Sequence, residues 1–315
     1  MISRTTITFS HPGLAGREHP AFEARGAQDG PRLALIGGIH GCEYSSIAAV
    51  MRFMNELDAS TLTGSIVAVP VVSMDSFRRR SPFVVPADGK NLNRCFPGDP
   101  NGTFAEVLAH AIFEELIAPS DFLVDLHGGD LVEALEPFAL YDESEVQDTA
   151  RAMAVAFGLP YVVCEARGQG GLTGMTTTAA AARNIPAVIA EAGGIGQLEE
   201  RAVNLLVDGM RNVLRQIQML PGAPEPPARP MRHVSGNVWL RSENQGWWEA
   251  AVRAGDEVQA GNVLGRVRDL WGDVLEVISA PDDGVVLFLT TSAAVEADGL
   301  LLGLGTGLTP IGATA

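Results

Sequence analysis

The chain has 315 residues, of which 46% are hydrophobic, and its 22 basic and 38 acidic residues give a formal net charge of −16. Such an acidic chain repels phosphates, which argues against nucleic acids and anionic membranes as partners. Three scattered cysteines exclude a disulfide framework, and the sequence shows neither a signal-peptide pattern nor an apolar run of about 18 residues. We therefore expect a cytoplasmic protein with a substantial core.

Residues 1–220 alternate short β-branched runs with helical patterns. Strands are predicted at Thr5–Phe9, Leu33–Gly37, Ile66–Val71, Phe122–Leu126, Phe138–Tyr141, Tyr161–Cys164 and Ala187–Ala190. Helices are predicted at Ser45–Leu57, Thr103–Ile117, Val146–Phe157, Thr173–Arg183 and Leu198–Met219. This alternation indicates an α/β domain with a mostly parallel sheet buried on both faces. Ligands should then bind at the carboxyl ends of the strands.

Residues 221–230 are rich in proline, which cannot continue a helix, and we interpret them as a linker. Residues 231–315 show short strands separated by turn residues, which predicts a smaller all-β domain. The spacing of its turns resembles the barrel-sandwich fold of lipoyl and biotinyl carrier domains. A carrier needs an acceptor lysine, and the chain has no lysine after Lys90, so the carrier role is excluded.

Two histidines and one glutamate follow predicted strands and could meet at one point. His40 and Glu43 stand three residues apart, just after a strand that ends in glycines. His127 ends another buried strand. Two histidines and one carboxylate form the ligand set of catalytic zinc, which keeps a fourth position open. Asp125, two residues before His127, points the same way and could orient that imidazole.

Two further segments carry chemistry that the sequence leaves open. Residues 78–98 form a polar loop, which is either a solvated basic run or a cationic pocket for an anionic substrate. Arginine in such a pocket binds a carboxylate through two parallel hydrogen bonds. Glu191 ends a third apolar strand beside Gly193 and Gly194, where it is either paired with an arginine or acts as a base. The other histidines are interpreted as structural: His11, His19, His110 and His233.

These segments stand in an order that resembles the succinylglutamate desuccinylase/aspartoacylase family, a branch of the zinc carboxypeptidases. The matching segments are Gly-Ile-His-Gly-Cys-Glu at 38–43, Asn-Leu-Asn-Arg-Cys-Phe-Pro-Gly at 91–98, Asp-Leu-His at 125–127 and Glu-Ala-Gly-Gly at 191–194. The resemblance covers nearly the whole chain, and the carrier-like C-terminal domain matches one bacterial subgroup. It implies a zinc-carboxypeptidase-like mixed sheet flanked by helices, with one zinc ion per chain.

The resemblance also implies roles for individual residues. His40, Glu43 and His127 would bind zinc, and Glu191 would act as general base and then general acid. Asn93 and Arg94 would grip the substrate carboxylate. An upstream arginine would polarise the scissile carbonyl; three are consecutive, and we assign Arg80 rather than its neighbours Arg78 and Arg79. The family's substrate-binding tyrosine has no clear match, and the candidates are Tyr141, Trp247 and Trp248.

The sequence therefore predicts a zinc-dependent hydrolase that cleaves the amide bond of a small N-acyl amino acid. Two alternatives stay open: a metallocarboxypeptidase that trims peptides, and a zinc-binding protein without turnover. In the family, the C-terminal domain narrows the entrance to the cleft, and we expect the same here, with Trp247 and Trp248 as candidate contacts. The acyl group, the amino acid and the oligomeric state, including a homo-oligomer, are left open.

Overall fold

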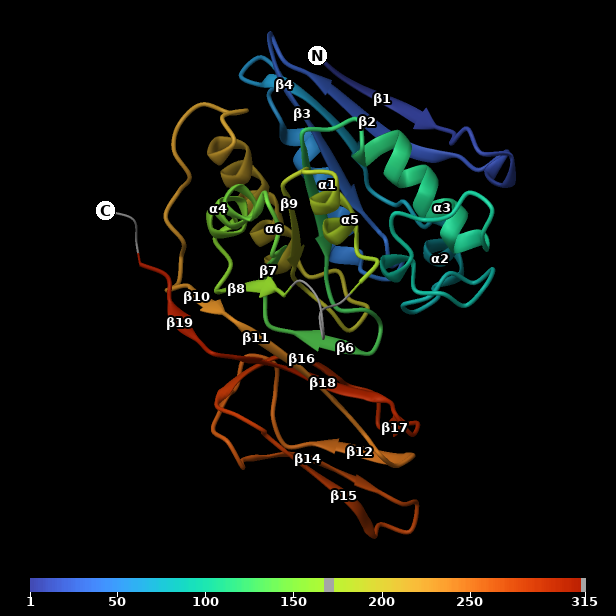
Figure 1. The fold of residues 1–315 in the computed structure, drawn as a ribbon, viewed down its shortest axis with the longest axis vertical. Coiled ribbons are helices and arrows are strands. Elements are labelled where there is room, and N and C mark those ends of the chain that lie inside the picture. The colour runs from blue at the N-terminus through green and yellow to red at the C-terminus, as the bar shows by residue number, and fades with distance from the viewer. Residues whose placement is uncertain (167–172, 313–315) are drawn as a thin grey trace.

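The structure is a computed structural model that describes residues 1–166 and 173–312. Within these residues, ten strands form one mixed sheet (Figure 1). Their order across the sheet is β1 (Ile2–Ile7), β2 (His19–Arg25), β4 (Thr63–Val69), β3 (Gln28–Gly37), β5 (Phe122–His127), β9 (Ala187–Glu191), β7 (Phe138–Asp142), β8 (Tyr161–Glu165), β10 (Arg232–Val234) and β19 (Thr309–Pro310). The central strands β4, β3, β5 and β9 are parallel, whereas β7 runs antiparallel to β9.

Helices cover both faces of this sheet, because its central strands are apolar on both sides. Residues Leu33 to Gly37 of β3, for example, are all buried. One face packs against α1 (Tyr44–Glu56), α4 (Gln147–Phe157) and α6 (Glu200–Gln216). The other packs against α3 (Phe104–Ile112), the π-helical turn Phe113–Ile117 and α5 (Thr176–Ala182). Short helical turns lie at Pro12–Leu14, Met74–Arg79 (α2) and Leu92–Arg94.

The polar loop of residues 78–98 is anchored to the first turn of α3. Glu106 accepts a hydrogen bond from the backbone N–H of Thr103 at 2.7 Å, which caps the first turn. The same carboxylate pairs with Lys90 at 2.9 Å, and Asp88 accepts a hydrogen bond from the backbone of Ala105. These contacts anchor the loop, so the residues that follow Lys90 have a defined position.

The C-terminal region is all-β and consists of two small sheets (Figure 1). The first contains β11 (Gly236–Arg241), β18 (Leu300–Thr306), β16 (Gly284–Thr290) and β13 (Glu257–Val258). The second contains β15 (Val274–Ser279), β14 (Val263–Arg268), β12 (Gly246–Ala250) and β17 (Ala294–Val295). Their facing side chains form a core of their own around Trp248 and Leu302. The predicted fold class, a mixed α/β sheet with a smaller all-β domain, is thus confirmed.

Strand pairing joins the two regions in both directions. Strand β6 (Glu133–Leu135) leaves the larger region and pairs with β16 of the first C-terminal sheet. In return, β10 and β19 extend the large sheet beyond β8. The boundaries 1–220, 221–230 and 231–315 remain a prediction, because these exchanges link the regions on either side. No helix in the described part of the chain is long and apolar enough to cross a membrane.

Candidate active site

The predicted metal ligands lie where three adjacent parallel strands end. Strand β5 lies between β3 and β9, and its register pairs Leu126 with Gly37 and His127 with Glu191. After β3, Gly38 has a φ of +60°, a conformation that side-chain-bearing residues rarely adopt, and the chain turns sharply there. This turn brings His40 and then Glu43, at the start of α1, over the end of β5. Residues distant in sequence thereby reach one edge of the sheet.

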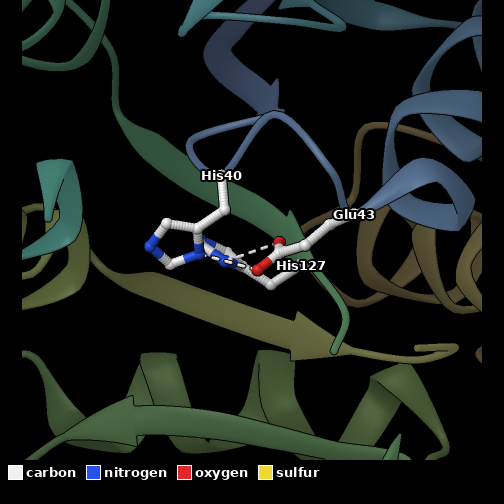
Figure 2. A group of neighbouring side chains, drawn as sticks. All are labelled: His40, Glu43 and His127. Carbon is white, nitrogen blue, oxygen red and sulfur yellow. Dashed lines mark hydrogen bonds and ion pairs between the residues drawn. The ribbon is translucent and has the colours of Figure 1, made fainter. Parts of the chain in front are cut away.

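Within this edge, the Glu43 carboxylate lies between two imidazoles (Figure 2). Its Oε1 lies 2.6 Å from Nδ1 of His40, and its Oε2 lies 3.0 Å from Nδ1 of His127. Ligand atoms of these three residues all lie within 4.8 Å of one another. The side chains are nearly inaccessible, with exposed fractions of 10% for His40, 3% for Glu43 and 2% for His127.

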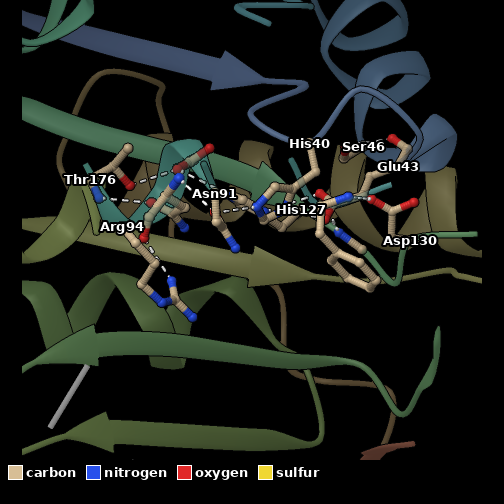
Figure 3. Close-up of polar contacts among 12 residues, drawn as sticks. His40, Glu43, Ser46, Asn91, Arg94, His127, Asp130 and Thr176 are labelled. Carbon is tan, nitrogen blue, oxygen red and sulfur yellow. Dashed lines mark hydrogen bonds and ion pairs between the residues drawn. The ribbon is translucent and has the colours of Figure 1, made fainter. Parts of the chain in front are cut away.

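The outer nitrogens of both imidazoles face oxygen acceptors (Figure 3). His40 Nε2 lies 3.0 Å from Asn91 Oδ1, and His127 Nε2 lies 3.1 Å from Asp125 Oδ2. Because these oxygens can only accept, each Nε2 carries the hydrogen and each Nδ1 is left with a lone pair. When the imidazoles are neutral, both lone pairs face the Glu43 carboxylate, an arrangement that a cation bound between them would satisfy. Two imidazole nitrogens and a carboxylate are donors that fit zinc.

Asp125 is itself held in place. The hydroxyl of Thr176, at the start of α5, donates to Asp125 Oδ2 at 2.6 Å, and Asp125 is fully buried. The other oxygen, Oδ1, has no hydrogen-bond partner among the described residues. The carboxylate therefore orients His127 from behind, which is the position expected for it from sequence.

The carboxyl groups at this edge differ in their pKa values. Burial disfavours ionised Glu43, but the neighbouring His127 and His40 outweigh it and lower the pKa of Glu43 to about 2. Burial raises the pKa of Glu191 well above its ordinary value, although His127 opposes the rise. Burial also raises the pKa of Glu133, to about 7. The pocket therefore combines one strongly ionised carboxylate, Glu43, with two carboxyl groups whose pKa values are raised, Glu191 and Glu133.

A pocket of about 380 Å³ opens on these groups. Its polar lining consists of His40, Glu43, Asn91, Asn93, Arg94, His127, Glu133, Glu191, Asn237 and Arg241. Its apolar lining consists of Phe83, Leu135, Phe138, Leu140, Met175, Ile189, Trp239, Phe288 and Leu300. Phe83 has a positive φ of 56°, and the buried Asp130 carboxylate accepts its backbone N–H at 2.7 Å. This bond holds a strained residue at the pocket wall.

Asn93 and Arg94, the predicted substrate-binding residues, both line this pocket. Asn93 is buried, and its Oδ1 accepts a hydrogen bond from the backbone of Thr176 at 3.0 Å. Arg94 reaches into the pocket and remains accessible there, while its Nη1 donates to the backbone oxygen of Asn93 at 2.6 Å (Figure 3). Loss of solvation lowers the pKa of the Arg94 guanidinium, although the negative charges of Glu165 and Glu191 oppose this shift.

Arg80 is not brought to the pocket. It follows α2 in a left-handed conformation, with a φ of 54°, and its side chain is exposed. It is also absent from the pocket lining. The role predicted for Arg80 therefore lacks support from its position.

The aromatic candidates are also placed elsewhere. Tyr141 is buried, and its hydroxyl lies 3.3 Å from His233 Nε2. Trp248 belongs to the core of the small domain, whereas Trp247 is 49% exposed. None of the three lines the pocket. The C-terminal region nevertheless borders it, through residues that the sequence did not single out.

Those residues are Asn237, Trp239 and Arg241, which alternate along β11 and so share one face of the strand. Glu133, on the short strand β6, was also missed. The alternation Asn-Val-Trp-Leu-Arg at 237–241 is a signal that a half-buried strand presents these side chains. It does not indicate that their face meets the pocket.

Comparison with known proteins places this chain in a family. Residues 29–217 match the succinylglutamate desuccinylase/aspartoacylase catalytic domain. The chain belongs to this family. Over 251 residues it is 32% identical to the N-alpha-acetyl-L-2,4-diaminobutyric acid deacetylase of Halomonas elongata, covering 77% of this chain and 72% of the relative. The resemblance seen in the sequence motifs is therefore confirmed.

Solved structures of the same family superpose over almost the entire chain. The product-bound ectoine utilization protein EutE (DoeB) of Ruegeria pomeroyi is 26% identical, with a TM-score of 0.85 over 97% of this chain and 95% of that one. A succinylglutamate desuccinylase/aspartoacylase from Rhodobacter sphaeroides is 26% identical, with a TM-score of 0.81 over 98% and 95%. The agreement extends through the C-terminal β region, which is therefore a shared part of these proteins.

Proposed function

We propose that this protein is a zinc-dependent hydrolase that cleaves the amide bond of a small N-acyl amino acid. The observation that supports this most directly is the meeting of His40, Glu43, His127 and Glu191 at the ends of β3, β5 and β9. Structural zinc needs a fourth protein ligand, whereas catalytic zinc keeps that position open. The three-residue donor set faces a pocket, so substrate and water have access to it.

His40 Nδ1, His127 Nδ1 and the Glu43 carboxylate would hold the metal. When bound, zinc lowers the pKa of a coordinated water and polarises the amide carbonyl. Glu191 takes a proton from the attacking water and returns it to the amide nitrogen as the carbon–nitrogen bond breaks, so that the nitrogen leaves as a neutral amine. A raised pKa helps the carboxyl group to hold the proton between these two steps.

The other end of the substrate would bind at Asn93 and Arg94. Arg94 offers a guanidinium fork that matches a carboxylate. The C-terminal strand β11 borders the pocket, and a volume of about 380 Å³ suits a compact substrate. This favours an acyl amino acid over a polypeptide. The deacetylase relative makes N-alpha-acetyl-L-2,4-diaminobutyrate the first substrate to test.

The experiment measures zinc content by mass spectrometry and amine release from N-acetyl, N-succinyl and N-formyl amino acids. We expect about one zinc ion per chain and turnover of at least one of these compounds. Faster release of C-terminal residues from peptides would support the carboxypeptidase alternative. Bound zinc without any amine release would support a binding protein instead.

A further inference from the structure

Among the residues that the structure describes, few contacts fix the orientation of the Arg94 guanidinium. One nitrogen donates to the backbone oxygen of Asn93, and Glu165 and Glu191 act on it electrostatically. Within the described residues, no carboxylate lies within 4.0 Å of it. An arginine side chain with free rotamers binds a carboxylate weakly, because ordering it costs entropy on binding. A contact that fixes the plane of the guanidinium would reduce this cost.

That contact comes from the C-terminal region. The guanidinium carbon of Arg94 lies 5.9 Å from the ring centroid of Trp239, on strand β11. A cation over an indole face is attracted by the ring quadrupole, and tryptophan is the strongest such partner. Both side chains line the pocket, so the contact forms its wall.

Trp239 is in turn fixed by an aromatic stack within the first C-terminal sheet. Strand β18 lies between β11 and β16, and its Gly303 is paired with Trp239 on one side and Phe288 on the other. The ring of Phe288 lies over Gly303, where a Cβ atom would come within 2.2 Å of it. Because Gly303 has no side chain, Phe288 reaches Trp239, and their rings meet edge to face at 5.3 Å and 76°.

We propose that Trp239 is a positioning residue for Arg94, so that the C-terminal β region forms part of the site that binds the substrate carboxylate. Phe288 and Gly303 keep the indole in place, and the indole holds the guanidinium in the plane in which its fork meets the carboxylate. This deepens the proposed function and rests on it. The C-terminal region thus contributes to substrate affinity, beyond narrowing the entrance.

The proposal differs from a purely steric role in one measurable way. If Trp239 acts through Arg94, its loss affects only substrates that carry a carboxylate. If it merely fills the wall, its loss affects the free acid and its amide alike. The matched probes are N-alpha-acetyl-L-2,4-diaminobutyrate and the same compound with an α-carboxamide.

The experiment compares Trp239→Leu and Trp239→Phe with wild type, and uses Trp247→Leu as the matched control. Trp247 lies on β12 of the same region, is exposed and does not line the pocket. We expect Trp239→Leu to raise KM for the free acid about 3- to 30-fold, with kcat little changed and the carboxamide unaffected. Trp239→Phe keeps an aromatic face and should recover part of the loss. Trp247→Leu should behave as wild type.

An equal loss for acid and carboxamide, or a fall in kcat alone, would overturn the proposal. Where the carboxamide reacts too slowly to measure, the KM and kcat values for the acid decide. If Trp239→Leu does not fold, Trp239→Phe still tests the idea, with a smaller rise in KM. Absence of turnover in wild type would contradict the proposed function; calorimetric binding of the same acid to wild type and both variants then tests Trp239 separately.

Discussion

The pocket wall that carries the predicted metal ligands and the wall that carries Arg94 and Trp239 are built in different ways. The first uses the ends of parallel strands in the large mixed sheet, where neighbouring register brings His127 beside Glu191. The second combines Arg94, from a short helical turn, with Trp239 and Phe288 from a separate antiparallel sheet. Parallel strands deliver catalytic groups to one edge whatever the rest of the chain does, whereas the second wall exists only because two regions pack together.

This difference predicts distinct consequences for mutation. Changes in the wall that carries the predicted metal ligands should remove catalysis, because they take away a metal ligand or a proton carrier. Changes in the wall that carries Arg94 and Trp239 should mainly weaken substrate binding, because they alter the hydrogen bonds available to the substrate carboxylate.

The largest effect is expected for His127→Ala. Removing one of three ligands leaves too few donors for tight zinc binding, so both zinc content and turnover should fall close to background. The control is His110→Ala, because His110 on α3 does not line the pocket. Full zinc occupancy in His127→Ala would remove His127 from the ligand set.

The next largest effect is expected for Glu191→Gln, and comparison with Glu133→Gln distinguishes the two carboxyl groups whose pKa is raised. Glu191→Gln keeps the size of the side chain but removes the basic oxygen, and kcat should fall roughly 10²–10⁴-fold with zinc content intact. Glu133→Gln changes the other such group, on β6 at the junction of the regions, and should cost much less. If Glu133→Gln proved the more damaging of the two in a steady-state assay, the general base would be reassigned to Glu133.

A smaller effect, on binding, is expected for Arg94→Lys. Lysine keeps the charge but loses the two-pronged geometry, so KM should rise about tenfold with a minor change in kcat. Arg183→Lys is the matched control and should leave KM unchanged, since Arg183 is exposed, pairs with Glu114 and does not line the pocket. An unchanged KM in Arg94→Lys would mean that the carboxylate binds elsewhere.

The smallest effect is expected for Arg80→Gln. The side chain is exposed and does not line the pocket, so kcat/KM should change by about twofold or less. A drop of two or more orders of magnitude would instead show that Arg80 reaches the scissile carbonyl when substrate is bound. That result would restore the role suggested by the sequence motifs.

The sequence predictions and the described structure agree best for candidate site residues that lie at the end of a strand or directly after one. Apolar, β-branched runs predict the buried strands, and the structure places His127 and Glu191 at the ends of β5 and β9. Asp125 lies two residues before the end of β5, whereas His40 and Glu43 follow β3 in the turn that leads into α1. Strand β2 was not predicted, because Pro20 and its alternating polar residues weaken the signal. Helix α2 was missed because its short polar stretch has no apolar repeat.

By itself, the sequence determined the α/β class and the all-β C-terminal region, and it singled out the three residues, His40, Glu43 and His127, that the structure brings together. These depend on local patterns: apolar runs, glycine turns and residues placed directly after them. Only the tertiary structure decided that Trp239, rather than Trp247 or Trp248, meets the pocket, and that Arg80 lies outside it. The physical reason is that the position of Trp239 depends on pairing between distant strands, such as β6 with β16. It also depends on which face of β11 turns toward Arg94.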